Sequence, residues 1–165
     1  MVYKGGEIVI KAKEGVLDRL NDLLSAELTS INQFFLHAEM CRSWGYERLC
    51  EKIRARSVDE MKDAEELVKH ILYLEGKPSM TLGKLTVGES VPDQFQVDLK
   101  LETDMLNRLR ESITHCAKVG DYTTRSILER MIEDEESHID WIETQLDTIK
   151  QVGLQNYLAE QIRKD

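Results

Sequence analysis

The chain has 165 residues, enough for one domain with a substantial core, and it carries a formal net charge of −9. This acidic balance, with Lys and Arg scattered along the chain, argues against a nucleic-acid surface, because phosphate contacts need clustered basic side chains. Charged residues make up 32% of the chain and aromatic residues only 6%, and the glycines and prolines gather in clusters, which favours an all-helical protein.

The N-terminal segment, MVYKGGEIVIKAK, lacks the continuous apolar core of a signal peptide, and no later segment is apolar for long enough to span a bilayer. Cys41, Cys50 and Cys116 have no Cys-x-x-Cys spacing, which argues against a disulfide framework and against a thiolate metal site. We therefore expect a cytoplasmic protein with reduced thiols and no membrane contact.

Turn-forming clusters then divide the chain into four long helical segments and a short fifth one. The predicted helices cover about residues 12–43, 46–75, 91–118, 121–151 and 154–163. Gly120 is placed to end a helix in the left-handed conformation and Asp121 to cap the next, while Pro92 suits a first helical turn. We expect one all-α domain over residues 1–165.

Apolar residues recur every three or four positions in the long segments, the spacing of a helix face that packs against other helices in a bundle. The pattern is clear in the first, third and fourth segments and looser in the second. It is formed by Leu17, Leu20, Leu24, Ile31, Phe34, then Leu49, Ile53, Leu67, Ile71, Leu74, then Phe95, Leu99, Leu106, Leu109, Ile113, Cys116, and finally Leu128, Met131, Ile142 and Ile149.

Connection lengths restrict the order of the helices in space. The breaks at SWGYE and KVGDY are short, so each joins two antiparallel neighbours. A helix of about 28 residues is about 42 Å long, and a middle loop of about 16 residues can extend to about 53 Å. The loop can therefore cross the whole bundle, which makes the third helix parallel to the second, as in ferritin-like bundles.

A glutamate fills a gap in the apolar pattern of each long segment. Desolvating four carboxylates costs several kcal/mol each unless they are paired, and Arg56 is the only obvious basic partner at an inward position. We therefore expect these glutamates to point inward and to bind a cluster of cations. They are Glu27, Glu60, Glu102 and Glu135.

His138 follows Glu135 by three residues, which places both side chains on one helix face. Single glutamates on two helices together with Glu-x-x-His pairs on two others form the ligand set of di-iron carboxylate sites in bundle cores. Oxygen and imidazole ligands suit Fe(II), Mn(II) or Zn(II), and redox chemistry with oxygen favours iron. Without this role, His138 would be an ordinary core histidine.

From about Lys11 to Lys164, the chain resembles the bacterioferritins. The resemblance is carried by ELTSINQFFLHAEM, LEGKPSMTLGKLTVGE, DEESHIDWIETQLDTI and the C-terminal GLQNYLAEQIRKD. It implies a hollow shell of two dozen subunits that oxidises Fe(II) with O2 or peroxide at an intrasubunit di-iron centre and keeps the ferric mineral inside. It also implies a b-type haem between two-fold-related subunits, and it leaves room for a ferredoxin-type reductant that releases the iron.

By position, the resemblance assigns Glu27, Glu60, Glu102, Glu135 and His138 to the iron ligands. It assigns Met61 as the axial haem ligand, supplied once by each partner subunit. From the residues alone, Met61 lies roughly 100° around its helix from Glu60 and faces outward, where packing at a subunit contact is the simpler interpretation. The resemblance places four more residues at the same interface: Asn32, Phe35, Val58 and Lys62.

Three positions depart from the family's pattern. Asp63 stands where a sixth iron ligand, a histidine, is expected; Phe34 replaces a tyrosine near the irons, and Ala55 replaces a histidine of the inner surface. Aspartate can bind iron through oxygen, but its side chain is shorter and adds negative charge. We expect either a ferroxidase slower than a complete centre, with Asp63 as a ligand, or a weak or vacant iron site.

The departures leave two functions open. The chain is either a ferroxidase and iron-storage subunit, or a haem-bearing shell subunit with an impaired centre that assembles with a complete second bacterioferritin subunit. A metal-free scaffold would leave the four glutamates unexplained. A rubrerythrin would need a cysteine-rich iron domain, and a Dps-type protein places its iron ligands between subunits.

In the fifth segment, apolar side chains recur at helical spacing, so this segment needs a surface to bury them against. They are Leu154, Tyr157, Leu158 and Ile162. We expect neighbouring subunits around a symmetry axis to supply that surface. The spacing assigns no role to the remaining histidines, His37, His70 and His115.

Overall fold

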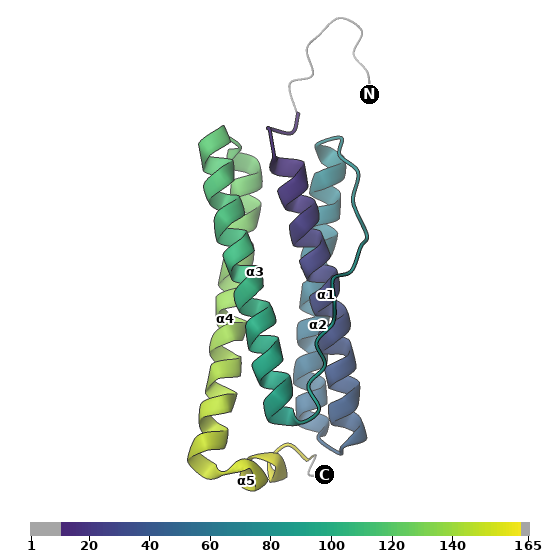
Figure 1. The fold of residues 1–165 in the computed structure, drawn as a ribbon, viewed down its shortest axis with the longest axis vertical. Coiled ribbons are helices and arrows are strands. Elements are labelled where there is room, and N and C mark those ends of the chain that lie inside the picture. Colours follow the sequence, from purple (N-terminus) through teal and green to yellow (C-terminus); the bar gives the residue numbers. More distant parts are fainter. Residues whose placement is uncertain (1–10, 163–165) are drawn as a thin grey trace, which may run out of the picture.

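The computed structural model describes residues 11–162, which form four long helices and a short fifth one (Figure 1). The four long helices pack as a bundle, α1 chiefly against α2 and α3 chiefly against α4, which confirms the predicted ferritin-like fold class. The helices are α1 Val16–Ser43, α2 Glu47–Tyr73, α3 Val91–Val119, α4 Tyr122–Val152 and α5 Leu154–Ala159.

The two outer ends of the helical region are shorter than expected. The first helix begins at Val16 rather than near residue 12, because Gly15 takes a left-handed conformation with φ 73° before it. The last helix ends at Ala159 rather than near residue 163. Residues 1–10 and 163–165 lie outside the described part of the chain, so a single domain over residues 1–165 stays a prediction.

The turn chemistry between the helices follows the sequence closely. Gly120 ends α3 with φ 72°, and the Asp121 carboxylate accepts a hydrogen bond of 2.9 Å from the Thr124 backbone N–H, which caps α4. Pro92 lies in the first turn of α3, after the Ser90 cap. These local signals fix where α3 ends and α4 begins.

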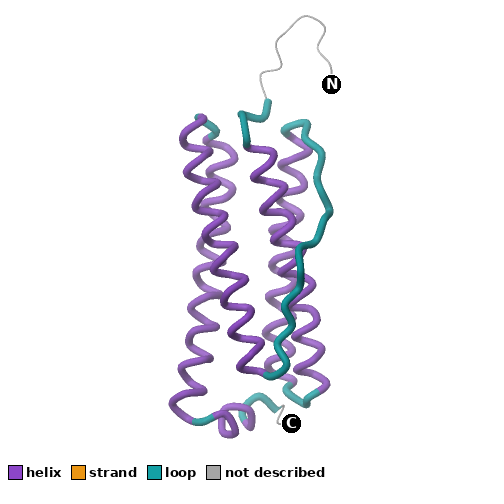
Figure 2. The backbone as a smooth tube through the Cα atoms, in the orientation of Figure 1, coloured by secondary structure: helices purple, strands orange, loops and turns teal. Residues whose placement is uncertain are grey.

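The connection from α2 to α3 runs the length of the bundle beside α1, so α3 starts at the far end and runs parallel to α2, as predicted (Figures 1 and 2). Three backbone N–H groups of this crossover donate to side chains of α1 that lie four residues apart, on one helix face. The pairs are Gly83 to Thr29 Oγ1 at 2.8 Å, Thr86 to Gln33 Oε1 at 3.0 Å and Gly88 to His37 Nε2 at 3.1 Å.

The hydrophobic core is divided into two clusters along the bundle axis. One surrounds Leu20, Leu67 and Leu109, and the other surrounds Phe34 and Phe95. Buried charged side chains lie at the helix positions between them, from Glu27 on α1 to Glu135 on α4. The bundle is therefore stabilised by apolar packing on both sides of a polar layer, and this layer contains the candidate site.

Helix α5 folds under the end of the bundle, where α4 ends (Figure 1). Tyr157 is buried in the apolar cluster around Phe34 and Phe95. It lies edge-on to Phe95 and donates a hydrogen bond of 2.9 Å to Gln145 Oε1. The expectation that only neighbouring subunits would cover this helix was therefore wrong in part, because its own bundle buries Tyr157. Leu154 and Ile162 remain 39% and 49% exposed.

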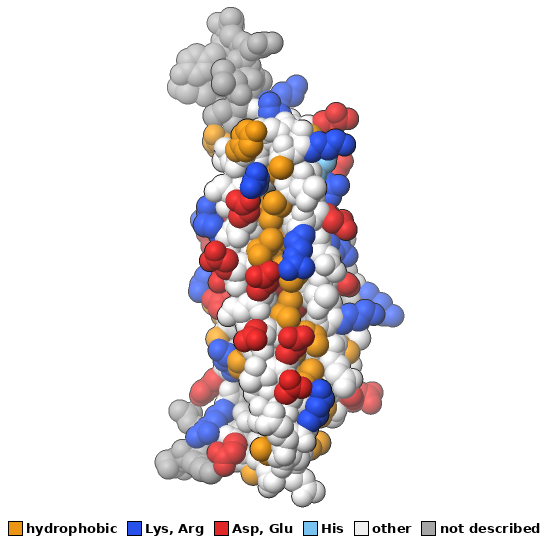
Figure 3. Space-filling view, turned by 90° about the vertical axis from the view of Figure 1, so that its left-hand side faces the viewer, with side chains coloured by type: hydrophobic (Ala, Val, Ile, Leu, Met, Phe, Trp, Pro, Cys, Tyr) orange, Lys and Arg blue, Asp and Glu red, His pale blue; other side chains and the backbone are white. Residues whose placement is uncertain are grey.

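On the face formed by α3 and α4, acidic and basic side chains alternate around a narrow line of hydrophobic ones (Figure 3). This mixed pattern differs from the concentrated basic stripe that binds nucleic acid. Within the described residues, no helix is both long enough and apolar enough to cross a membrane.

Candidate metal centre

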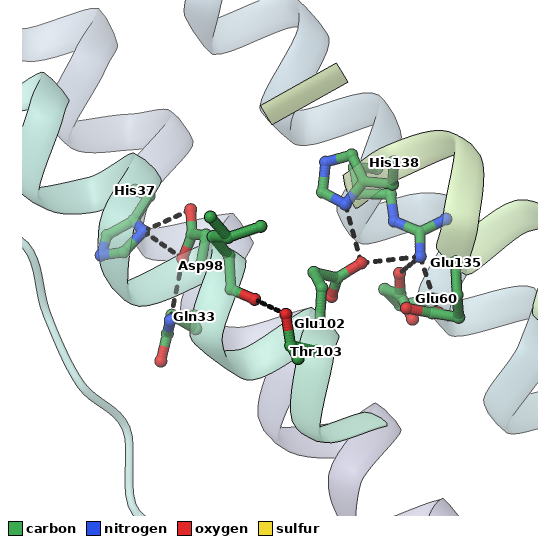
Figure 4. Close-up of polar contacts among 10 residues, drawn as sticks. Gln33, His37, Glu60, Asp98, Glu102, Thr103, Glu135 and His138 are labelled. Atoms are coloured by element: carbon green, nitrogen blue, oxygen red, sulfur yellow. Dashed lines mark hydrogen bonds and ion pairs between the residues drawn. The ribbon is translucent and has the colours of Figure 1, made fainter. Parts of the chain in front are cut away.

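Four glutamates converge in the middle of the bundle, one from each long helix. Glu27, Glu60, Glu102 and Glu135 each have an exposed fraction of 0%, as the gaps in the apolar pattern predict. Figure 4 shows three of them, on α2, α3 and α4, pointing toward one another and toward His138. Each helix is held in place by apolar contacts above and below its glutamate, so the carboxylates are positioned before any ligand arrives.

Several oxygens of these carboxylates have no hydrogen-bond partner. Both oxygens of Glu27 are unpartnered, and so is one oxygen each of Glu102 and Glu135. Burial raises the pKa of Glu27 well above its usual range, and the carboxylates of Glu135 and Asp63 raise it further. Buried polar atoms without partners are rare in folded proteins. The arrangement therefore lacks positive charge or donors on the side of Glu27.

Ligand atoms of Glu27, Glu60, Asp63 and Glu135 lie within 4.8 Å of one another, close enough to surround one cation. We refer to these residues as the four-carboxylate group. Carboxylate oxygens are hard donors that suit Fe(II), Mn(II) and similar ions. The donor chemistry and the unpartnered Glu27 oxygens fit a divalent metal ion, whereas the role of each residue as a ligand stays a prediction.

Asp63 is the least buried member of the four-carboxylate group. Burial raises its pKa to about 6, with the charges of Asp134, Glu66 and Asp59 acting in the same direction and Arg56 in the opposite one. Its carboxylate both belongs to the group and lines a cavity that opens between α2 and α4. Asp63 thus lies between the buried carboxylates and the cavity.

Arg56 enters the centre from α2 with an exposed fraction of only 8%. Its Nη2 contacts Glu60 and lies 3.0 Å from Glu102 Oε2 and 2.7 Å from Glu135 Oε1. The three carboxylates raise the pKa of Arg56 despite its burial, so the guanidinium stays charged. The sequence identified Arg56 as a basic side chain at an inward position. It could not show that Arg56 contacts carboxylates from three helices at once, its own helix included.

His138 lies beside Glu102, with 2.7 Å between its Nδ1 and Glu102 Oε2 (Figure 4). Burial lowers the pKa of His138 to about 3, and the charge of Arg56 lowers it further, so the ring is neutral and its Nδ1–H donates to Glu102. The ring stacks on Trp141 and meets the edge of Phe34. We refer to Arg56, Glu102 and His138 as the arginine cluster.

A cavity of about 680 Å³ between α2 and α4 connects both parts of the centre to solvent. Its wall contains Arg56, Asp63 and His138 together with the acidic side chains of Asp59, Asp134 and Asp140. Ala55, at one of the departures from the family pattern, lies on the same wall. Lys52 and Lys62 also line the cavity, and Asp63 is the member of the four-carboxylate group that reaches it.

Met61 lies next to Glu60 on α2 but faces outward, and it is 55% exposed whereas Glu60 is fully buried. Phe35 and Val58 are also exposed, at 51% and 44%, so the predicted haem-side residues include large apolar side chains that one subunit leaves uncovered. The polar residues predicted for the same interface have partners within the chain: Asn32 donates to the Leu28 carbonyl, and Lys62 pairs with Asp59 at 2.7 Å.

The histidines that the sequence left without a role hold elements together. His37 accepts a hydrogen bond from the crossover at Nε2, so its Nδ1–H donates to the buried carboxylate of Asp98, which also accepts from Gln33 at 2.8 Å (Figure 4). His70 Nε2 lies 2.8 Å from Thr124 Oγ1. His115 Nε2 lies 2.7 Å from the Glu14 carbonyl. Sequence spacing could not reveal these contacts because each joins distant segments.

Comparison with known proteins supplies the context of this centre. The family model of the ferritin-like domain matches residues 17–152. A bacterioferritin of Mycobacterium bovis is 44% identical over 146 residues, 88% of this chain and 92% of the relative. Bacterioferritins of Brucella melitensis and Streptomyces coelicolor are 39% and 42% identical, and each alignment covers 90% of this chain and 92% and 90% of the relative, respectively.

Proposed function

The chain belongs to the bacterioferritin family of ferritin-like proteins, and from this premise we propose that it is an iron-storage subunit that oxidises Fe(II) at its buried carboxylate centre. The observation that carries the proposal is the set of four fully buried glutamates, one from each long helix, with oxygens that no protein group satisfies. A bound cation satisfies those oxygens, and none of the described contacts does.

Fe(II) is the substrate and the cargo of this centre. The carboxylates of Asp134 and Asp140 on the cavity wall attract the ion, and the four-carboxylate group replaces water around it. Anionic oxygen donors favour the higher charge of Fe(III), so they lower the free-energy cost of oxidation. Each Fe(II) gives up one electron: two Fe(II) and two protons reduce one hydrogen peroxide to two water molecules, and four Fe(II) and four protons reduce one O2 to two water molecules. The neutral ring of His138 orients Glu102 through its Nδ1–H.

The ferric product would be stored inside a shell of 24 copies, as the resemblance implies, and a ferredoxin-type reductant would return it to Fe(II) for release. We place this shell in the cytoplasm. The centre departs from the predicted set of six ligands for two iron ions on the side of the arginine cluster, where Arg56 already pairs with Glu102 and Glu135.

Met61 supports a second part of the proposal, the binding of a b-type haem between two subunits. Two copies related by a two-fold axis would each present Met61 with Phe35 and Val58, and these exposed apolar side chains suit the apolar faces of a porphyrin. The thioether of Met61 would serve as the axial ligand. Substitution Met61→Leu keeps the apolar surface, so it should abolish haem loading without dissociating the shell; unchanged haem absorption would contradict this assignment.

Two observations favour the alternative function. Arg56 among the carboxylates and Asp63 in place of a histidine both suit a haem-bearing subunit whose own centre is impaired and which assembles with a complete second subunit. Such a chain would contribute haem and shell structure. Isolating shells from the native host decides whether a second subunit is present.

Iron loading tests the proposal directly. Metal-free shells receive Fe(II) in air, and the iron that co-elutes with the shell in size exclusion is measured beside the rate of oxidation. We expect retained iron and oxidation faster than in buffer, and the double substitution Glu27→Gln with Glu135→Gln should reduce the rate at least tenfold. Oxidation at the rate of buffer with no retained iron would favour the alternative function or refute storage.

A further inference from the structure

Arg56 places a permanent positive charge inside the centre itself. Its Nη2 is shared by oxygens of Glu60 on the same helix, Glu102 on α3 and Glu135 on α4. An arginine normally leaves such a site for water, yet this one is 8% exposed. One nitrogen therefore stands where several carboxylates converge, the surroundings that a divalent cation prefers.

The contacts of Arg56 occupy one oxygen each of Glu102 and Glu135 on its side of the centre. Glu102 Oε2 lies 3.0 Å from Arg56 Nη2 and 2.7 Å from His138 Nδ1. Guanidinium has only donors and no lone pair to offer, so it cannot itself be a ligand, and its charge repels a metal ion from the oxygens with which it pairs. A metal ion between Glu102 and His138 would also face a full positive charge at the distance of a hydrogen bond.

The opposite side of the centre is free of Arg56 contacts at Glu27, whose two oxygens are unpartnered and fully buried. Asp63 completes this side, and its ligand oxygen lies within 4.8 Å of those of Glu27, Glu60 and Glu135. The two sides differ in positive charge: Arg56 pairs with Glu102 and with one oxygen each of Glu60 and Glu135, whereas both oxygens of Glu27 have no partner.

We propose that Arg56 takes the place of one of the two metal ions expected in this centre and leaves a site for a single divalent ion in the four-carboxylate group. The proposal deepens the proposed function and rests on it for the identity of the metal as iron. A centre with one ion has no second metal beside it, so each bound Fe(II) supplies one electron, and the oxidant, O2 or hydrogen peroxide, takes its remaining electrons from ions that bind in succession. This geometry gives a physical reason for the slower oxidation expected from Asp63.

Counting bound ions tests the proposal without any turnover. Metal-free shells are dialysed against Co2+, whose visible absorption reports the coordination of the ion, and tightly bound Co2+ per chain is measured. We expect one ion for the wild-type chain and two for Arg56→Gln, which frees Glu102 and His138. The matched control is Arg54→Gln on the same helix, since Arg54 is exposed and pairs with Glu39; it should leave the count at one.

The outcomes separate this inference from the proposed function. Two ions in the wild-type chain, with Arg56 displaced, would overturn the inference and leave iron storage intact. An unchanged count of one in Arg56→Gln would also overturn it. No ion in either chain would refute the centre itself. If Arg56→Gln fails to assemble, Arg56→Lys keeps the positive charge and should bind one ion, and the wild-type count still decides.

Discussion

The carboxylates of the centre show how much a residue pattern can establish. The gaps in the apolar spacing predicted the burial of Glu27, Glu60, Glu102 and Glu135, because a helix face is a fixed geometric consequence of position. The position of the Arg56 guanidinium was not predictable in the same way. A long side chain can extend to water or turn inward. Only the packed structure shows that the guanidinium of Arg56 contacts carboxylates on α2, α3 and α4.

Glu27 illustrates a conflict between stability and binding. In the metal-free chain its buried carboxylate has no partner, whereas an amide at this position can donate to neighbouring carboxylates. We expect Glu27→Gln to raise the free energy of unfolding of the metal-free shell by about 1–3 kcal/mol, the usual cost of an unsatisfied buried group. The same change should abolish most of the rise in melting temperature that Zn2+ produces.

Thermal unfolding with and without Zn2+ measures both effects. The matched control is Glu133→Gln, an exposed glutamate on α4, which should change neither quantity. A lower melting temperature for Glu27→Gln without metal, together with an undiminished Zn2+ effect, would show that Glu27 is not part of a cation site.

His70 gives the folded chain a pH dependence outside the centre. Burial lowers its pKa below the usual 6.5, although Asp121 and Glu66 oppose the shift. The folded state therefore binds fewer protons than the unfolded state, and the stability due to neutral His70 falls as the pH drops through 6.5. Substitution His70→Gln keeps a donor for Thr124 but cannot titrate. The wild-type melting temperature should fall relative to this variant between about pH 7.5 and about pH 5.5; a constant difference would contradict the assignment.

At the scale of elements, the sequence predicted the order of the helices, the cap at Asp121, the position of Pro92 in a first helical turn, and the long crossover. Loop length and helix length showed that the crossover can run along the whole bundle. What holds it there was not predictable, since Thr29, Gln33 and His37 read as ordinary polar residues of a helix. The need for glycine at position 88 was not predictable either. An added Cβ there would lie 2.3 Å from the backbone nitrogen of Gln94, a contact that only the folded structure shows.

The hydroxyl of Thr29 provides a test of this attachment. It donates to the Ser25 carbonyl and accepts from the Gly83 N–H at 2.8 Å. Substitution Thr29→Val removes the acceptor at nearly constant volume, at a cost of about 1 kcal/mol, so hydrogen exchange at Gly83 should accelerate about fivefold. Thr103→Val is the matched control, because Thr103 is exposed and its hydroxyl bonds only within α3. Equal exchange at Gly83 in both variants would refute the attachment.

At the scale of the whole molecule, the sequence indicated that the fifth helix needs a surface, and the structure divides that surface in two. Tyr157 packs into the chain's own core, while Leu154 and Ile162 stay exposed. Deleting everything after Gly153 would therefore damage the subunit as well as any assembly. Assembly cannot be read from one chain, because an exposed apolar side chain does not name its partner.

The paired substitution Leu154→Ser with Ile162→Ser separates the two effects. Because Tyr157 keeps its contacts, helical content should stay unchanged, whereas the shell should dissociate into smaller species. Size exclusion and circular dichroism measure the two properties together. A variant that elutes as an intact shell would show that these side chains do not join subunits.

The most direct measurement of the whole account is anomalous scattering at the iron edge from crystals soaked in Fe(II). The account predicts one iron peak per chain inside the bundle, between the oxygens of Glu27, Glu60, Asp63 and Glu135, with Arg56 still against Glu102. A pair of peaks with Arg56 displaced would contradict the replacement of a metal by arginine. The absence of any peak inside the bundle would contradict the iron centre.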